Sequence, residues 1–514
     1  MNRGAAFLAS ALVGLAAARV GAAQPLSKST FKLHLFAEPT TLSPFLQRNS
    51  NSSYFLSQMS CPLLKWTGTQ TVEAGASCRF QKQFLLVECQ IDPALKFQDG
   101  SPVTALHYQQ SFQQFVNPDK PSPRAELLLS IKNAGSILKK EKPLSSLGIK
   151  ADQNKLTIEL ENPDPEFLLR LANPLLTAVA TPDIPILPAW QNFKSCGPYQ
   201  ISSWSSGKSI LLAPNPHFNR GHADRPPLQF LFVTEDSLAL QYYQKNDLDF
   251  LRRLPTLYIP AWKDKPDYRS IQQIRFDSLL LSPDDRKPKL AKALAQSIDY
   301  EAWRQLYFAA PRPGCFGLPA AWTDGPICWD FKPSEAKATL KTLKPAGAAL
   351  GLRLFYSKQG GDDHDRTMEF LQDQWKKNLS LEVHIEAQEN KIFVETLRAG
   401  KISIFRKGLA PDRASCLAVL ENFRSDHPEN YVKFQDPDFD QLIDALKKQN
   451  SKKSKAKLCR DGVLALRDKA YLIPTGPIYF SLLVKPNWEG VQLNNLNHLD
   501  LSQLHLKAAP ALIR

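Results

Sequence analysis

The chain has 514 residues, of which 43% are hydrophobic and 22% are charged, so it is neither a disordered nor a collagen-like protein. At about 100–200 residues per domain, this length predicts two or three packed lobes and excludes a small disulfide-stapled scaffold. The formal net charge of +14 admits nucleic acid or an anionic membrane surface as a partner, but the charge is spread along the chain and indicates neither strongly.

The N-terminus has the pattern of a cleavable secretory signal. A short cationic start is followed by an Ala- and Leu-rich run at residues 5–18 and by small residues before position 24. A retained membrane anchor is the alternative, but the apolar run is shorter than the ~20 residues that span a bilayer. We expect cleavage after Ala23, so that residues 1–23 are a signal peptide and the mature protein is soluble and periplasmic. The first Cys is Cys61, so no lipid anchor is expected.

Strand and helix patterns alternate along the chain without an internal repeat. In the helix that begins after Thr104, the side chains of Tyr108, Phe112 and Phe115 fall on one face, which predicts a core stripe rather than a ligand site. The strand, helix and strand within residues 352–385 predict a parallel βαβ unit, and therefore an α/β fold with mixed sheets. Strands are predicted at residues 31–36, 78–91 (a hairpin), 209–213, 276–282, 352–356 and 381–385, and helices at residues 104–116, 237–245, 290–298 and 367–377.

Eight Cys residues in an exported chain are candidates for disulfides. Cys78 and Cys89 flank a segment that can form a hairpin, which would bring their sulfurs opposite each other. Cys315 and Cys328 flank a Pro/Gly-rich loop. We predict both pairs as structural bridges, with free thiols as the alternative, since sequence alone does not fix connectivity. The remaining residues, Cys61, Cys196, Cys416 and Cys459, stay unassigned, and none of the eight lies in a C-x-x-C pair that would indicate zinc or a redox site.

The familiar catalytic motifs are absent. Residues 206–209 resemble the end of a phosphate-binding loop, but the first Gly of that motif would fall on Ser202. No G-x-S-x-G, H-E-x-x-H or strand-linked G-x-G-x-x-G occurs. Residues 362–365 (Asp-Asp-His-Asp) are expected to form a polar loop before a helix rather than a metal site. The basic tract at residues 447–457 lacks stacking aromatics, so it predicts a solvated loop rather than a nucleic-acid patch. We expect a non-enzymatic protein without metal or cofactor.

Five short segments share the pattern of one protein family. Residues 95–105 read Leu-Lys-Phe-Gln-Asp-Gly-Ser-Pro-Val-Thr-Ala, and E-P-x-x-L-x-P, C-G-P-Y, N-P-x-F and A-L-A-Q-S-I-D lie at residues 38–44, 196–199, 215–218 and 293–299. In order and spacing these segments resemble, over nearly the whole mature chain, the extracytoplasmic solute-binding proteins of ABC importers, family 5, the oligopeptide/dipeptide-binding proteins. Tyr300 stands where the family usually has Arg.

The resemblance implies a two-lobed periplasmic-binding-protein fold (type II, cluster C). Two crossing strands join the lobes in this family, the first lobe carries an extra subdomain, and the ligand is enclosed as the lobes close. By analogy, residues 24–273 form the first lobe with its extra subdomain, residues 274–489 form the second lobe, and residues 490–514 return to the first lobe.

The resemblance also implies a ligand site. Residues 405–412 (Phe-Arg-Lys-Gly-Leu-Ala-Pro-Asp) are similar to the family segment R-x-G-W-x-A-D, in which the Asp meets a peptide α-ammonium and the Arg can meet a carboxylate. This match implicates Asp412 and Arg406. Independently of the family, a peptide zwitterion removed from water needs an opposite charge at each terminus and sheet-like hydrogen bonds along its main chain. Residues 49–53, with Asn49 and Ser50, are expected to supply those bonds, with Arg48 nearby.

Two departures from the family pattern bear on the ligand. Leu409 replaces the usual Trp, and Arg413 stands beside Asp412. This extra cation would favour an anionic ligand, such as a cell-wall peptide or an acidic peptide. Alternatively, Asp412 is an exposed loop acid that only pairs with Arg413.

The sequence therefore predicts a monomeric binding protein that captures short peptides between two closing lobes and meets an ABC permease transiently. The alternatives are the same fold with another solute (a sugar, a metal chelate, haem or an anionic cell-wall peptide), an exported hydrolase, and a basic adhesion or nucleic-acid-binding protein.

Overall fold

The structure is a computed structural model of the whole chain. It describes residues 30–47, 50–184, 187–281, 288–306, 313–343, 351–358, 362–399, 403–427, 429–469 and 472–507. The predicted signal peptide, Arg48 and Asn49 lie outside these described residues.

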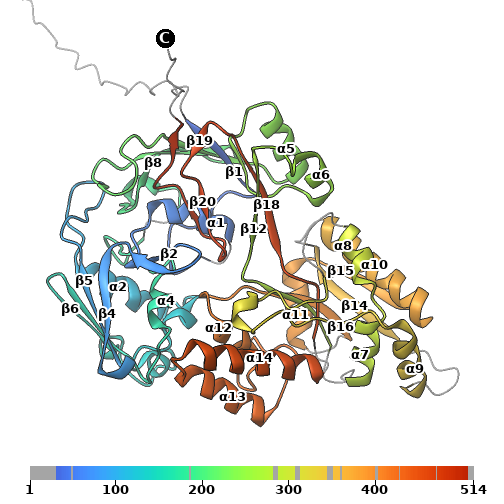
Figure 1. Cartoon of the computed structure of the whole chain (residues 1–514). Coiled ribbons are helices and arrows are strands. Elements are labelled where there is room, and N and C mark those ends of the chain that lie inside the picture. Colours follow the sequence, from blue (N-terminus) through green and yellow to red (C-terminus); the bar gives the residue numbers. More distant parts are fainter. Residues whose placement is uncertain are drawn as a thin grey trace, which may run out of the picture.

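A seven-stranded mixed sheet is the centre of the first lobe, in the upper part of Figure 1. Phe31, Leu33 and Leu35 alternate along β1 and are buried, as the sequence pattern predicts. Strand β1 is parallel to β10 and β11, and the other neighbouring pairs are antiparallel. Helix α1 (Ser50–Leu56) packs in the hydrophobic cluster on one face, and α5 (Asp236–Gln244) and α6 (Ile259–Trp262) pack in the cluster on the other. Across the sheet the strands are β12 (Tyr268–Gln272), β18 (Tyr479–Val484), β11 (Phe250–Leu251), β1 (Phe31–Leu35), β10 (Leu228–Phe232), β9 (Ser209–Pro214) and β8 (Tyr199–Ser205).

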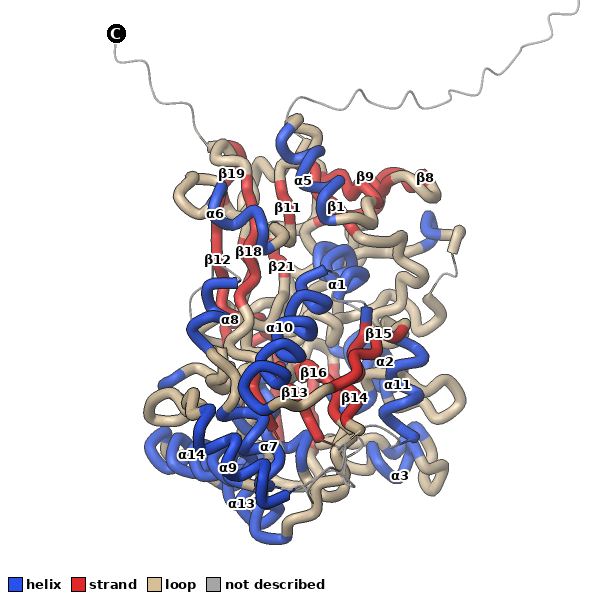
Figure 2. The backbone as a smooth tube through the Cα atoms, turned by 90° about the vertical axis from the view of Figure 1, so that its right-hand side faces the viewer, coloured by secondary structure: helices blue, strands red, loops and turns tan. Residues whose placement is uncertain are grey.

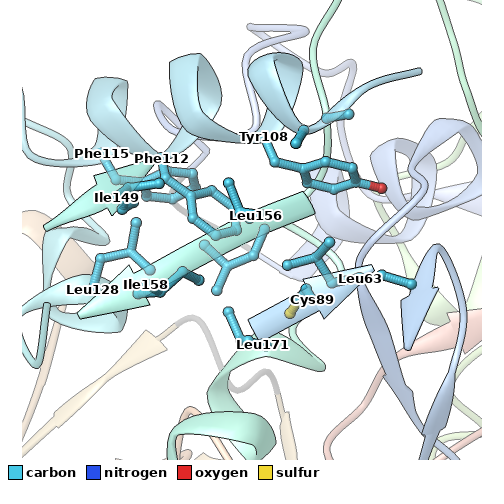
Figure 3. Packing of buried hydrophobic residues seen from close by; sticks show 14 of the residues in the cluster. Leu63, Cys89, Tyr108, Phe112, Phe115, Leu128, Ile149, Leu156, Ile158 and Leu171 are labelled. Carbon is cyan, nitrogen blue, oxygen red and sulfur yellow. The ribbon is translucent and has the colours of Figure 1, made fainter. Parts of the chain in front are cut away.

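An antiparallel four-stranded sheet extends the first lobe and has its own hydrophobic core. Figure 3 shows α2 (Ala105–Phe115) lying over this sheet with Tyr108, Phe112 and Phe115 directed into the core. All three side chains are buried, which confirms the predicted stripe. The sheet consists of β4 (Ala76–Gln81), β5 (Leu86–Ile91), β7 (Lys155–Glu159) and β6 (Ile149–Asp152), and α4 (Phe167–Leu171) closes the core from the opposite side.

Shorter elements complete the first lobe. They are α3 (Ala134–Leu138) and three antiparallel pairs of short strands: β2 (Leu64–Trp66) with β3 (Thr71–Glu73), β19 (Trp488–Glu489) with β22 (His505–Leu506), and β20 (Gln492–Leu493) with β21 (Leu499–Asp500).

The second lobe is built on a five-stranded mixed sheet covered by helices on both faces. Strand β14 (Leu352–Ser357) is parallel to β15 (Val383–Gln388), and α10 (Asp362–Leu379) connects them, which confirms the predicted βαβ unit. The other strands are β16 (Ile404–Leu409), β13 (Phe276–Leu281) and β17 (Leu472–Pro474). One face carries α7 (Pro288–Gln296), α8 (Tyr300–Leu306), α9 (Pro333–Leu343) and α10, and the other carries α11 (Asn390–Ala399), α12 (Cys416–Leu420), α13 (Pro437–Lys448) and α14 (Lys452–Asp468).

The chain passes between the lobes twice, and Figure 2 shows the two sheets one above the other with β12 and β18 leading toward the junction. The first passage lies at residues 273–275, between β12 and β13, and the second at residues 475–478, between β17 and β18. The sequence placed the second passage at Gly490. The difference arises because β18 is antiparallel to both β11 and β12 and is therefore an internal strand of the first lobe.

Two polar segments are more helical than the sequence indicated. Helix α10 begins at Asp362, within the segment predicted as a polar loop, because acidic residues suit a helix N-terminus and the buried Leu371 and Trp375 anchor the following turns. In the basic tract only residues 449–451 lie between α13 and α14. Lys and Ala are good helix formers, and the buried face of α14 includes Val463 and Leu466.

All eight Cys residues are paired. The predicted bridges Cys78–Cys89 and Cys315–Cys328 are both present. The four Cys that the sequence left unassigned form Cys61–Cys196, which closes a separation of 135 residues in the first lobe, and Cys416–Cys459, which ties α12 to α14.

Candidate functional site

The segment after β16 meets the first lobe through Arg413, whose side chain is 0% exposed. Its guanidinium donates from Nε to Glu166 Oε2 at 2.7 Å and from Nη1 to Asp412 Oδ1 at 2.8 Å. Nη1 also donates to Glu421 Oε1 at 2.9 Å. These three carboxylates raise the pKa of Arg413 even though burial opposes its charge. Arg413 is thus the central cation of a contact between the lobes, since Glu166 belongs to the first lobe.

Asp412 is held between two guanidinium groups. Its Oδ1 accepts from Arg413, and its Oδ2 accepts a short hydrogen bond from Arg170 Nη1 of α4. Burial would raise the pKa of Asp412, but Arg170 and Arg413 lower it to about 2. The side chain of Asp412 is only 11% exposed. The alternative prediction, an exposed loop acid paired with Arg413, is therefore wrong about the exposure of Asp412. Its pairing of Asp412 with Arg413 is present in the structure.

We call this cluster the interlobe network, and Figure 1 shows α4 beside α12 where it forms. Arg170 Nε lies 3.5 Å from Asp164 Oδ2, and Arg170 Nη2 lies 3.7 Å from Glu421 Oε1. Ser415 Oγ donates to Glu166 Oε1 at 2.6 Å. The network comprises Asp164, Glu166 and Arg170 from the first lobe and Asp412, Arg413, Ser415 and Glu421 from the second.

Arg406 lies on β16 and is engaged within the second lobe. Its Nη2 donates to Asp277 Oδ2 of β13 at 2.6 Å, and its Nη1 is in short contact with His364 Nε2 of α10. Burial and the adjacent Arg406 guanidinium lower the pKa of His364 to about 4. The structure thus gives Arg406 and Asp412 separate ionic partners, although the sequence placed both at the two ends of one ligand.

Gly408 makes room for another cation. A Cβ added to Gly408 would lie 2.5 Å from Arg275 Nη2 and 2.8 Å from its Nε, so the guanidinium rests on the bare backbone. Arg275 stands in the first passage between the lobes. The neighbouring Lys407 lies 3.8 Å from Glu429, and burial lowers the pKa of Lys407. The Gly of the predicted motif therefore has a steric role in this chain.

The segment expected to offer backbone hydrogen bonds to a ligand is not extended. Ser50 begins α1, and residues 50–56 are helical. Asn51 Oδ1 accepts from Phe36 N at 2.8 Å, and Asn51 Nδ2 donates to Ala37 O at 2.8 Å. The helix forms because Tyr54 and its neighbour Phe55 are buried in the core of the first lobe.

A second polar contact joins the lobes. Thr256 Oγ1 of the first lobe donates to Asp363 Oδ1 of α10 at 2.5 Å, and Arg366 Nη2 donates to Thr256 Oγ1 at 2.7 Å. The lobes are thus in direct contact at this point as well as at the interlobe network.

The described residues contain neither a cluster of metal ligands nor a membrane-spanning helix. Within residues 30–507, apart from the segments left out above, no group of three or more His, Cys, Asp or Glu side chains is arranged to hold a metal ion. In the same part of the chain, no helix has the length and apolarity to cross a membrane.

The residues of the first lobe that complete the network, Arg170 and Glu166, were not predicted from the sequence. Arg170 interrupts an apolar run with Leu168, Leu169 and Leu171 around it. A single charge in such a run is a signal for a buried ion pair, since long charged side chains are rarely buried unless they are paired. No pattern near Glu166 or Glu421 identifies their partners.

The chain is similar in sequence to one family of known proteins. The model of the bacterial extracellular solute-binding proteins, family 5 (middle), matches residues 85–431. The chain is 23% identical over 482 residues to the oligopeptide-binding protein OppA of Bacillus subtilis, with 88% of each chain covered. It is 24% identical over 422 residues to the periplasmic murein peptide-binding protein MppA of Escherichia coli, with 78% of each covered. It is also 26% identical over 529 residues to the probable deoxycholate-binding periplasmic protein YgiS of Escherichia coli, covering 96% of this chain and 97% of YgiS.

Solved structures share the fold. The murein tripeptide-binding protein MppA of Escherichia coli superposes with a TM-score of 0.81 at 21% identity, covering 93% of this chain and 99% of MppA. The Haemophilus influenzae OppA complex with the peptide RPPGFSPFR gives a TM-score of 0.78 at 20% identity, covering 93% and 99%.

Proposed function

Because the chain belongs to family 5 of the bacterial extracellular solute-binding proteins, we propose that it captures short peptides between its two lobes and delivers them to the permease of an ABC importer. The relatives compared are solute-binding proteins rather than enzymes. The observation that carries the proposal is the interlobe network, because it brings charged groups of both lobes to one buried junction. Closure of two lobes around a ligand is a recognised mode of binding.

Ionic groups at the junction match the needs of a peptide. In this proposal Asp412 is the acceptor for the α-ammonium, and Arg406 meets a carboxylate. Arg48, Asn49 and Ser50 remain predicted contacts. Since Asp412 already accepts from Arg170 and Arg413, an incoming ammonium exchanges places with one of these cations. The exchange keeps the buried carboxylate paired, which a charge removed from water requires.

The remaining parts of the proposal concern where and how the chain acts. The protein is exported, loses residues 1–23 and works in the periplasm as a monomer, without a cofactor. It meets its permease transiently and releases its ligand chemically unchanged. The first lobe extends from residue 24 to the first passage and resumes after the second, and the second lobe lies between the two passages.

A second candidate is an anionic ligand, such as a cell-wall peptide. The sequence offered Arg413 as the extra cation for such a ligand, but the interlobe network holds four carboxylates against the two guanidinium groups of Arg170 and Arg413, so its charge does not itself attract an anion. A murein peptide-binding protein and a probable deoxycholate-binding protein are among the relatives, so the family fold accepts ligands of more than one kind.

A melting experiment tests the proposal of a peptide ligand. The mature chain is unfolded and refolded to remove carried ligand, then heated with di- to pentapeptides, a murein tripeptide, deoxycholate, sugars and metal chelates. A ligand that binds only the native state at about 100 times its Kd stabilises it by about 2.7 kcal/mol. We expect peptides to raise the melting temperature and mass spectrometry to recover them intact. A rise with deoxycholate, a sugar or a chelate alone would keep the fold and overturn the peptide proposal.

A further inference from the structure

We propose that Arg170 is a specificity-determining residue: it occupies Asp412 in place of a ligand ammonium, so that peptides with a blocked N-terminus bind as well as peptides with a free one. This inference rests on the proposed function. It adds the class of ligand that the site accepts.

Arg170 is held firmly at this position. It extends from α4, whose Phe167 and Leu171 are buried in the core of the first lobe. Its guanidinium donates to Asp412 and lies 3.5 Å from Asp164 and 3.7 Å from Glu421. Its side chain is only 12% exposed. A short helix fixed by two core residues thus delivers a cation of the first lobe to a carboxylate of the second.

The occupied carboxylate changes what an α-ammonium gains on binding. Both oxygens of Asp412 already accept from a guanidinium, and the Asp412 side chain is only 11% exposed, so an ammonium reaches this carboxylate only at a position that a guanidinium now holds. An ammonium must therefore displace one guanidinium, so its net gain is the difference between two ion pairs. A blocked N-terminus leaves the pair between Arg170 and Asp412 intact and loses no ion pair.

Arg170 rather than Arg413 is the cation that yields. Arg413 is fully buried and shares Glu166 and Glu421 in addition to Asp412. When Arg170 leaves Asp412, the nearby carboxylate of Asp164 remains available to it. When an ammonium replaces Arg170 at Asp412, every buried charge therefore keeps a partner. Loss of Arg413 would instead leave Glu166 without its closest cation.

Paired peptide libraries test the inference. Dissociation constants are measured by calorimetry for an equimolar tripeptide library and for the same library after N-acetylation. We expect the refolded chain to bind both within about threefold of each other. In Arg170→Gln the carboxylate of Asp412 has a place for an ammonium, so we expect the free library to bind at least about tenfold more tightly than the acetylated one.

The matched control is Arg220→Gln, which breaks an Arg–Asp pair with Asp92 inside the first lobe, away from the junction. In Arg220→Gln the ratio of the dissociation constants for the acetylated and free libraries should equal that of the unsubstituted chain. If Arg170→Gln does not melt cooperatively, Arg170→Met, which keeps the apolar stem, replaces it.

Two outcomes overturn the inference and leave the proposed function standing: a preference of about tenfold or more for the free library in the unsubstituted chain, or an unchanged ratio in the Arg170 variant. Binding of neither library by a cooperatively melting chain would overturn the proposed function and the inference with it.

Discussion

Replacing Arg413 by Met should destabilise the protein strongly at neutral pH. Arg413 is fully buried and donates to three carboxylates, Glu166, Asp412 and Glu421, at 2.7, 2.8 and 2.9 Å. Removing one partner of a buried ionic cluster costs about 3–5 kcal/mol, because the remaining charges stay buried and lose their counter-ion. Met retains much of the apolar volume, so the loss reports on charge rather than on a cavity.

The pH dependence of this loss follows from the pKa of Asp412. In the folded protein this pKa is about 2 instead of the ordinary 3.8, which corresponds to about 2 kcal/mol of stability at neutral pH. Because the folded value is the lower one, that stability is present above the unfolded pKa and disappears as pH falls toward 2. In Arg413→Met the carboxylates take up protons more readily, so the difference from wild type should shrink between pH 7 and pH 4.

Urea titrations followed by tryptophan fluorescence at the two pH values measure both effects, and urea leaves ion pairs unscreened. Arg304→Met is the control, because Arg304 and Glu301 form a pair that is 42% and 58% exposed. The control should change the free energy of unfolding by less than about 1 kcal/mol. A loss in Arg413→Met that is equally small, or one of equal size at both pH values, would refute the reasoning.

Three further predictions concern the two lobes. Replacing Cys61 and Cys196 together by Ala opens a loop with a separation of 135 residues. If a disulfide stabilises by reducing the entropy of the unfolded chain, this change should lower the free energy of unfolding by about 5 kcal/mol, and loss of the Cys78–Cys89 bridge in the hairpin should lower it by about 3 kcal/mol. Equal losses for the two bridges would contradict this entropic explanation. Phe112→Ala removes a ring that is 0% exposed and should lower the melting temperature by an amount equivalent to about 3–5 kcal/mol; a loss under about 1 kcal/mol would show that α2 is not packed as described. Asp436 caps α13 by accepting from the backbone N–H groups of the second and third residues of that helix, so Asp436→Ala should cost about 1–2 kcal/mol in chemical unfolding, and no change would argue against the cap.

Patterns along the sequence predicted those elements whose structure depends on residues close to each other in the chain. The hairpin that carries Cys78 and Cys89 and the buried face of α2 could be read from alternation and from helical spacing. The two longer disulfides could not, because their separations of 135 and 43 residues leave no local pattern. The second passage was misplaced for a related reason, since β18 is defined by pairing with strands that lie more than 200 residues earlier.

The same limit applies to the site. A motif of eight residues led to Asp412, but its partner Arg170 is 242 residues away, and Glu166 is 247 residues from Arg413. Their pairing depends on how the lobes meet, which no local spacing encodes. Residues 50–56 form a helix rather than the extended segment that the sequence suggested, because Tyr54 is buried in the core.

Hydrogen exchange with and without bound peptide tests the central claim that a peptide is captured between the two lobes. Backbone amides that become buried or rigid on binding exchange more slowly. We expect slower exchange both at residues 404–413 of the second lobe and at residues 164–171 of the first, since these segments carry Asp412, Arg413, Glu166 and Arg170 of the interlobe network. Slowing confined to one lobe, or to surfaces remote from both segments, would contradict it.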